Sequence, residues 1–516
     1  MKISDGLRKW VESLTTAEKR FIKLLGKARA GANTSQQLEL FDWLNRSETD
    51  ETFPANAKFS QNLPTVTIRL KDLILDGLRM LHKEDNNDAL LRTTLDEIAM
   101  LHEKKLNPEA IKQIKRAKKL SMECCRYSFA LQCVEWQQKI AQSAPEGDTL
   151  EILKKLRGEE TDVLHKLTEQ REIQYRHDTL LALMRKQSLF HRDPKIALEV
   201  KELSEHEIVH RHSESGAYLE KAYAVNILGL RDIYNRDSMK ALVRYQKLLQ
   251  QWQENPSWQN DQSSLLLLIC KFYQAACFFS PVNWYEGEQY LTMLRNFKGL
   301  RPDDHRDFQR LLFHNQFVLA LNTGNFDSIK TLIPEIDHWL SKESDHLTGI
   351  QVLPFLCNFL VAEFLAGNFA SAHRIVSRIL NMPDKNARKD IREFARVLQT
   401  VLQFELGNDS LNEYLTRAGK RHFSKSDSEI KFELIVFRHI EKISRMESPK
   451  QQQEILSDLS KELNVLADQI KDGMPLLGLN EIRMWVTSKQ TSTSLRGIFL
   501  QEVRKNLEEL KQGESF

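Results

Sequence analysis

Proline and glycine are scarce in this chain, at 13 and 19 of 516 residues, about half of the ~5% and ~7% shares that proteins usually have. Because these two residues interrupt helices, their scarcity lets most segments continue as long helices. Segments with the alternating apolar pattern of strands are correspondingly rare. We therefore expect an all-α protein.

Long apolar runs and an excess of one charge are also missing. No run of about 18 uninterrupted apolar residues occurs, and amphipathic sequence follows Met1 without an apolar signal core. The 74 basic residues nearly balance the 71 acidic ones, so the whole chain has no field suited to nucleic acid or an anionic membrane. We expect a cytoplasmic protein that does not bind membranes.

Motifs for catalysis, redox chemistry or cofactor binding are absent as well. The six cysteines include no Cys-x-x-Cys pair and lie in apolar helical stretches, which is typical of buried free thiols. No nucleophile elbow, phosphate loop or dinucleotide-binding glycine pattern occurs. We therefore expect no enzyme activity and no cofactor, and no small-molecule substrate is evident.

What the chain does contain is a phrase repeated late in its sequence. The phrase centres on Gly-Asn pairs that lie 43 and then 40 residues apart, at Gly324-Asn325, Gly367-Asn368 and Gly407-Asn408. This interval is the length of two helices joined by a turn, and such hairpins stack into solenoids. At each turn we expect glycine to end the first helix in the left-handed conformation, which costs glycine little.

Apolar residues keep fixed offsets around these glycines. Positions six and three residues before each glycine are apolar and share one helix face: Val318, Val361, Val401, Leu321, Phe364 and Phe404. After the turn, steps of three and four form one stripe of the second helix: Ile329, Leu332 and Ile336 in the first copy, and Ala372, Ile375 and Ile379 in the second. In the third copy the same offsets hold Asn412, Leu415 and Gly419, so this copy is the weakest.

Turn signals recur upstream at intervals of roughly 40 to 46 residues. They lie at residues 106–108, 145–148, 191–194, 234–237 and 280–283. About eight hairpins would fit, and we assign the array to residues 86–445.

One copy resembles the tetratricopeptide family. The positions that carry the resemblance are Gly367-Asn368-Phe369, Ala372, Val376, Ile379-Leu380 and Pro383. They match the second half of that repeat, with a turn glycine, an aromatic, a small residue, apolar positions and a closing proline. The resemblance implies a right-handed superhelix of tetratricopeptide-like hairpins that binds other proteins on its concave surface.

Both ends of the chain differ from the array. In residues 1–85, a capping box from Thr15 to Glu18 and two further helices, one through Leu38 to Leu44 and one from Pro64 to Leu81, predict a three-helix unit. The stretches Leu14 to Phe21 and Leu38 to Asp42 resemble the start of a group of bacterial helical-repeat proteins to which no activity is attached. Residues 446–516 predict a polar C-terminal helical cap.

A short string, His206-Glu207-Ile208-Val209-His210, matches the His-Glu-x-x-His pattern of zinc peptidases. In such enzymes the helix is buried and flanked by uncharged residues, whereas Glu205 and Arg211 bracket it here and no strand pattern precedes it. We interpret it as a solvated helix end. Arg–His pairs of the kind used by helical ribonucleases occur about as often as chance predicts.

Two groups of residues are candidates for partner binding. Lys112, Lys115, Arg116 and Lys119 recur at helical steps of three and four and form one basic face. Trp252 and Trp258 flank Asn255-Pro256-Ser257, so we expect them around a loop, where large rings can anchor a peptide. The neighbouring aromatic residues are interpreted as core.

The sequence thus favours a non-catalytic protein–protein interaction scaffold whose repeat array binds a protein or peptide. The alternative is a DNA-associated regulator, in which a helix-turn-helix-like N-terminal unit with Arg69 and Lys71 binds nucleic acid and the repeats sense a partner. The near balance of charge makes nucleic acid the less favoured partner.

Overall fold

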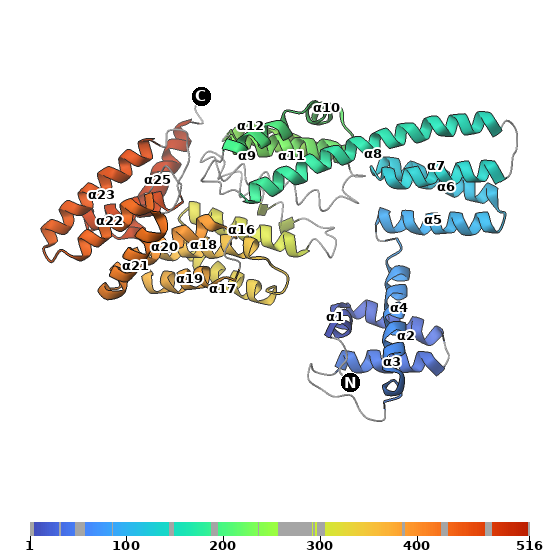
Figure 1. Cartoon of the computed structure of the whole chain (residues 1–516), viewed down its shortest axis with the longest axis horizontal. Coiled ribbons are helices and arrows are strands. Elements are labelled where there is room, and N and C mark those ends of the chain that lie inside the picture. Colours follow the sequence, from blue (N-terminus) through green and yellow to red (C-terminus); the bar gives the residue numbers. More distant parts are fainter. Residues whose placement is uncertain are drawn as a thin grey trace. The chain divides into compact units, whose positions relative to one another are not determined.

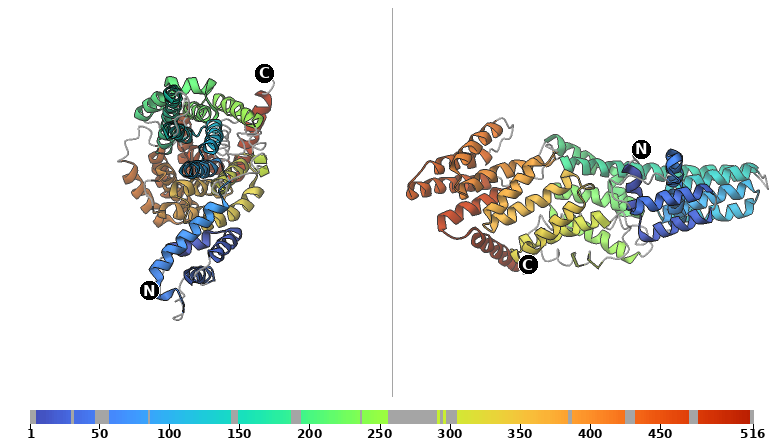
Figure 2. Two further views of the ribbon diagram at one scale, coloured as in Figure 1. Left: turned by 90° about the vertical axis from the view of Figure 1, so that its right-hand side faces the viewer. Right: turned by 90° about the horizontal axis from the view of Figure 1, so that it is seen from below.

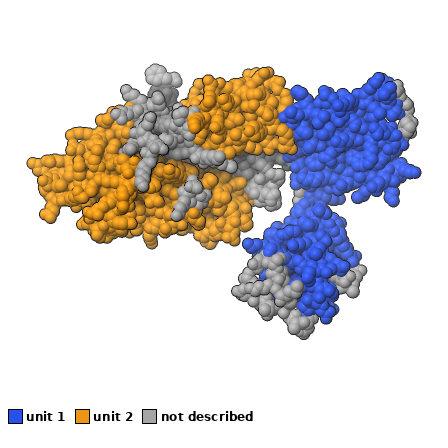
Figure 3. Space-filling model, viewed as in Figure 1, with its two compact units in different colours: residues 1–168 blue, residues 169–516 orange. Residues whose placement is uncertain are grey.

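The computed structural model describes residues 5–29, 32–46, 57–84, 86–143, 149–186, 194–235, 237–255, 291–292, 295–296, 305–383, 387–424, 432–469 and 477–513. Every regular element in these ranges is a helix and none is a strand (Figure 1), which confirms the all-α prediction. No helix within them combines the length and the apolar composition that crossing a membrane requires. The chain divides into two compact units, residues 1–168 and 169–516 (Figure 3).

Unit 1 begins with a cluster of four helices rather than the three that we expected. These are α1 (Asp5–Ser13), α2 (Thr16–Ala28), α3 (Ala32–Arg46) and α4 (Leu63–Leu81), with a short 3-10 turn, η1 (Ser60–Asn62), before the last. The additional helix is α1, because Leu7 and Val11 are fully buried in the core of this cluster. The predicted capping box is confirmed, since Thr15 and Glu18 bond each other reciprocally at the start of α2.

Three helices of equal length follow in unit 1: α5 (Asn87–Glu103), α6 (Asn107–Glu123) and α7 (Tyr127–Ser143). Each packs on the next, around a core that includes Ile98, Ile114 and Cys133. The following helix, α8 (Thr149–Lys186), is a single helix of 38 residues where the turn spacing predicted a hairpin. Nothing in the sequence ends it, because it contains no proline and its one glycine, Gly158, lies in open space. The boundary between the two units falls within α8.

Unit 2 continues with α9 (Pro194–Ser204), α10 (Glu207–Ser215), α11 (Tyr218–Tyr234) and α12 (Ser238–Glu254). Helix α11 is buried on nearly every side and packs against the other three. Gly229 allows α12 to approach closely, because an added Cβ atom there would lie only 2.0 Å from the hydroxyl oxygen of Tyr245.

The repeated phrase lies in the part of unit 2 that follows residue 304. Its helices are α16 (His305–Asn322), α17 (Phe326–Lys342), α18 (Gly349–Leu365), α19 (Phe369–Asn381), α20 (Lys389–Glu405), α21 (Asp409–Phe423), α22 (Phe432–Ser444) and α23 (Pro449–Gln469). Consecutive helices pack as pairs, and α16, α18, α20 and α22 also contact one another in that order. In Figure 2 the yellow and orange helices of this region lie side by side.

The three Gly-Asn turns have the same backbone geometry. Gly324, Gly367 and Gly407 have φ angles of +67°, +80° and +70°. At each turn the glycine N–H donates to the carbonyl three residues earlier, and the following asparagine N–H donates to the carbonyl five residues earlier. This is the Schellman motif, and it confirms the left-handed glycine that we predicted. In the weak third copy, Asn412 and Gly419 are buried like their counterparts.

Two turns of the same kind occur in unit 1 without glycine. Lys105 and Cys125 have φ angles of 62° and 55°. The N–H groups of Leu106 and Arg126 donate to the carbonyls of Leu101 and Ser121 at 2.9 and 2.7 Å. Turns of this kind in unit 1 therefore carry no Gly-Asn pair in the sequence.

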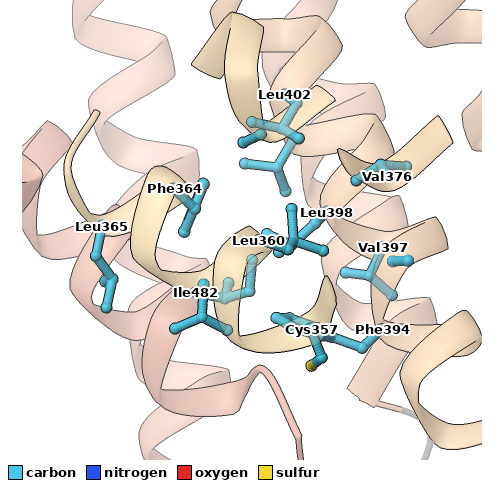
Figure 4. Close-up of a cluster of buried hydrophobic side chains, with 14 of the residues drawn as sticks. Cys357, Leu360, Phe364, Leu365, Val376, Phe394, Val397, Leu398, Leu402 and Ile482 are labelled. Atoms are coloured by element: carbon cyan, nitrogen blue, oxygen red, sulfur yellow. The ribbon is translucent and has the colours of Figure 1, made fainter. Parts of the chain in front are cut away.

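The C-terminal helices α24 (Leu479–Thr491) and α25 (Leu495–Gly513) are not simply the polar cap that we expected. Trp485 of α24 is fully buried. Figure 4 shows Ile482 of α24 among Leu360 and Phe364 of α18 and Leu398 of α20. The first helices of the repeated hairpins therefore bury a face against a segment far away in the sequence.

Candidate interaction surfaces

The basic face predicted on α6 is exposed. Lys112, Lys115, Arg116 and Lys119 are all exposed, while Ile114 and Ala117 of the same helix are buried. Lys119 lies 3.9 Å from Glu123, and the other three form no ion pair with any residue that the structure describes. The structure therefore brings the four cations together on one face.

Of the two tryptophans predicted to bind a partner, the structure describes only Trp252. Trp252 is only 5% exposed and belongs to the core around α11, which differs from the loop position that we expected. The loop signal is correct in that α12 ends at Glu254. However, Trp252 lies four residues after Leu248 and seven after Tyr245, so it shares their buried stripe. Trp258 lies outside the described residues.

An open groove of about 480 Å³ lies between α10, α11 and α12. Its apolar wall consists of Val225, Leu228 and Leu248. The polar residues that line the groove are His210, Ser213, Glu214, Lys221, Arg244, Lys247 and Gln251. Three of these are full cations and one is a carboxylate, so the groove favours an acidic ligand. No sequence motif marks this groove, because its residues come from three different helices.

The cations of the groove differ in how they are held. Arg244 Nε donates to Asp232 Oδ2 at 2.7 Å, and Asp232 is buried. Lys221 Nζ donates to the carbonyl oxygen of Glu214 at 3.3 Å. Lys247 is exposed and forms no ion pair within the described ranges. Lys221 and Lys247 therefore keep charge available for a ligand carboxylate.

Only one histidine of the zinc-like string, His210, lies within α10, and the other, His206, precedes the helix. His206 is the N-cap of α10, and its Nδ1 accepts a hydrogen bond from the N–H of Ile208 at 3.3 Å. His210 lies within α10 and lines the groove. Nowhere in the described part of the chain do three His, Cys, Asp or Glu residues gather as a metal site would require.

A buried thiol, Cys357, and a partly buried imidazole, His314, lie in unit 2. Burial raises the pKa of Cys357 to about 12. Burial, with the nearby charge of Arg310, lowers the pKa of His314 to about 4. At neutral pH the thiol is protonated and the imidazole is neutral, so this cysteine is not an activated nucleophile.

A third surface is already occupied by the chain itself. Glu405, at the end of α20, accepts hydrogen bonds from Trp485 Nε1 at 2.7 Å and from Lys489 Nζ at 2.6 Å. The Glu405 side chain is only 7% exposed. Charge-assisted bonds in such a desolvated place are strong. No sequence signal pairs residues that are 80 positions apart.

Comparisons with known proteins do not add a family. No protein-family model matches the chain, and neither a curated protein nor a solved structure matches it.

Proposed function

We propose that this chain is a non-catalytic scaffold that binds a protein or peptide through a right-handed superhelix of tetratricopeptide-like hairpins. The observation that supports this function is the groove between α10, α11 and α12. There an apolar wall lies beside Lys221 and Lys247, whose ammonium groups form no ion pair with a described residue. A groove of this composition suits a peptide with an apolar anchor next to carboxylates. Three equivalent Schellman turns in unit 2, at Gly324, Gly367 and Gly407, support the repeat array.

In the proposed complex, apolar contacts provide affinity and charged contacts select the sequence of the partner. An apolar side chain of the partner packs against the apolar wall at Val225, which is 8% exposed whereas Leu228 and Leu248 behind it are 1% exposed. This contact supplies affinity because it is desolvated. Acidic side chains of the partner pair with Lys221 and Lys247 and select acidic over basic sequences. Arg244 contributes less, because its guanidinium is already bonded to Asp232.

The test places a photo-crosslinking amino acid at Gln251, in the groove, and in a second sample at Lys330, which is exposed on α17. We expect partners captured only from position 251, and their loss in the double variant Lys221→Glu, Lys247→Glu. Identical partners from both positions, or unchanged capture in the double variant, would contradict the proposal.

A second candidate function, the DNA-associated regulator, is supported by one observation. The four cations of α6 are exposed together, and three of them have no ion-pair partner among the described residues. Such a face can follow phosphates. The N-terminal unit offers Arg69, which is exposed, whereas the Nζ of Lys71 lies 5.6 Å from the centroid of the Trp10 ring.

This second candidate predicts duplex DNA binding that weakens steeply with salt, because bound cations release counterions. Changing Lys112, Lys115, Arg116 and Lys119 to Glu abolishes such binding, while the groove variant Lys247→Glu leaves it intact. Salt-insensitive capture of one protein at position 251, without duplex binding, would favour the scaffold instead.

A further inference from the structure

The last described helix, α25, covers one of the three equivalent turns. A Cβ atom added at Gly324 would lie 2.6 Å from Cδ2 of Leu500 and 3.9 Å from Cγ1 of Val503. The same addition at Gly367 or Gly407 meets nothing within 4 Å. All three turns nevertheless share one φ range and one hydrogen-bond pattern. The turn therefore forms without a cover, and α25 is not needed to hold its shape.

The contact between α25 and the turn is apolar and aromatic. The ring of Phe499 meets that of Phe326 edge to face, with centroids 5.8 Å apart. The guanidinium carbon of Arg496 lies 4.6 Å from the centroid of the Phe326 ring. One side of α25 is apolar and packs on the rest of unit 2. Its residues are Leu495, Phe499, Leu500 and Val503.

Among the side chains that the structure describes, fewer are buried in α25 than in α24. The opposite side of α25 is exposed, at Gln501, Glu502 and Arg504. It is joined to α24 through Ser492, a non-glycine residue with φ +53° and ψ +25°, a conformation that costs about 1–2 kcal/mol. Helix α24, in contrast, is anchored by the buried Trp485. An amphipathic helix that follows a strained joint and keeps one side exposed is a region expected to open locally.

We propose that α25 is a displaceable cover, and that the surface beneath it is a binding site for an amphipathic helix of a partner protein. The site consists of the Gly324 turn, Phe326 and the neighbouring part of α18. The sequence of α25 defines the ligand class: a cation, an aromatic residue three positions later, and aliphatic residues four and seven positions after the cation. This surface is separate from the groove between α10 and α12, so the inference does not depend on the proposed function.

The first experiment measures binding of a fluorescent peptide of residues 494–513 to the full chain. In wild type the resident helix competes with the peptide. The variant Leu500→Ala weakens the resident helix and leaves the site intact, so we expect it to bind the peptide about tenfold more tightly than wild type. The control Gln501→Ala, on the exposed side of α25, binds like wild type. A peptide with Phe499→Ala and Leu500→Ala does not bind.

A pair of glycine variants separates release of the helix from damage to the site. Both Gly324→Ala and Gly367→Ala place an alanine in the left-handed conformation, so the backbone strain is the same in the two variants. Only Gly324→Ala also pushes a methyl group against Leu500. We expect trypsin to cleave α25 at Arg496 and Arg504 about tenfold faster in Gly324→Ala than in Gly367→Ala. Gly324→Ala nevertheless shows no gain in peptide binding, because its site is altered.

Three results would overturn the proposal. One is a folded Leu500→Ala chain that binds no peptide. Another is a loss of helical circular dichroism in this variant larger than α25 alone can account for, because the other helices would then depend on α25 to fold. The third is a dimer, seen by light scattering and abolished by Gly324→Ala, because a second copy would then be the occupant in place of a partner protein.

Discussion

At the scale of single residues, a few buried polar groups decide which faces of the helices meet. Glu405 shows this most clearly, because one carboxylate with little exposure accepts from both an indole and an ammonium group. Losing such an acceptor leaves a buried indole N–H without its bond, which costs more than the bond itself contributes. The stability of the α20–α24 contact therefore depends strongly on this residue.

We predict that Glu405→Ala lowers the free energy of unfolding of unit 2 by about 2–3 kcal/mol. Glu405→Gln retains an acceptor for Trp485 and loses the charge that holds Lys489, so it costs about 1 kcal/mol. Urea denaturation measures both values. The control is Glu413→Ala, which removes an exposed pair with Arg417 and costs at most about 0.5 kcal/mol. Equal losses for Glu405→Ala and Glu413→Ala would refute this role.

At the scale of elements, the recurring unit is a helix closed by a Schellman turn. Glycine occupies the left-handed position in three turns of unit 2, and Lys105 and Cys125 occupy it in unit 1. A side chain in this conformation is strained, whereas glycine is not. The two turns of unit 1 are therefore less stable than the same turns would be with glycine in the left-handed position.

We predict that Lys105→Gly raises the stability of unit 1 by roughly 0.5–1 kcal/mol, because the relieved strain exceeds the added entropy of the unfolded chain. The matched control is Lys104→Gly, one residue earlier, where φ is −81°. There glycine brings no relief and lowers stability by a similar amount. Hydrogen exchange of α5 and α6 reports both changes, and the same sign for both variants would disprove the explanation.

At the scale of the whole molecule, the chain folds as two compact units with separate apolar cores. In unit 1 the cores are built from residues of adjacent helices, with Val134 fully buried. In unit 2 the largest core joins α16–α23 with α24 and with Leu495 of α25, and Val436 is equally buried there. Each unit therefore has its own basis for stability.

We predict that Val134→Ala and Val436→Ala each cost about 2 kcal/mol, from lost burial and the small cavity left behind. The loss remains within the unit that carries the substitution. Hydrogen exchange with mass spectrometry should show reduced protection of α5–α7 for the first variant and of α18–α22 for the second. A uniform loss of protection along the chain in either variant would show one cooperative unit instead of two.

Sequence alone determined the helical class, the three glycine turns and the capping box at Thr15, because these depend on residues within one or two helix turns of each other. The exposure of the α6 cations was likewise predictable from helical spacing. Only the tertiary structure decided that Trp252 is buried and that α24 packs on α20. These outcomes depend on which apolar faces meet across tens of residues, and a periodic pattern shows that a face is buried without showing what covers it.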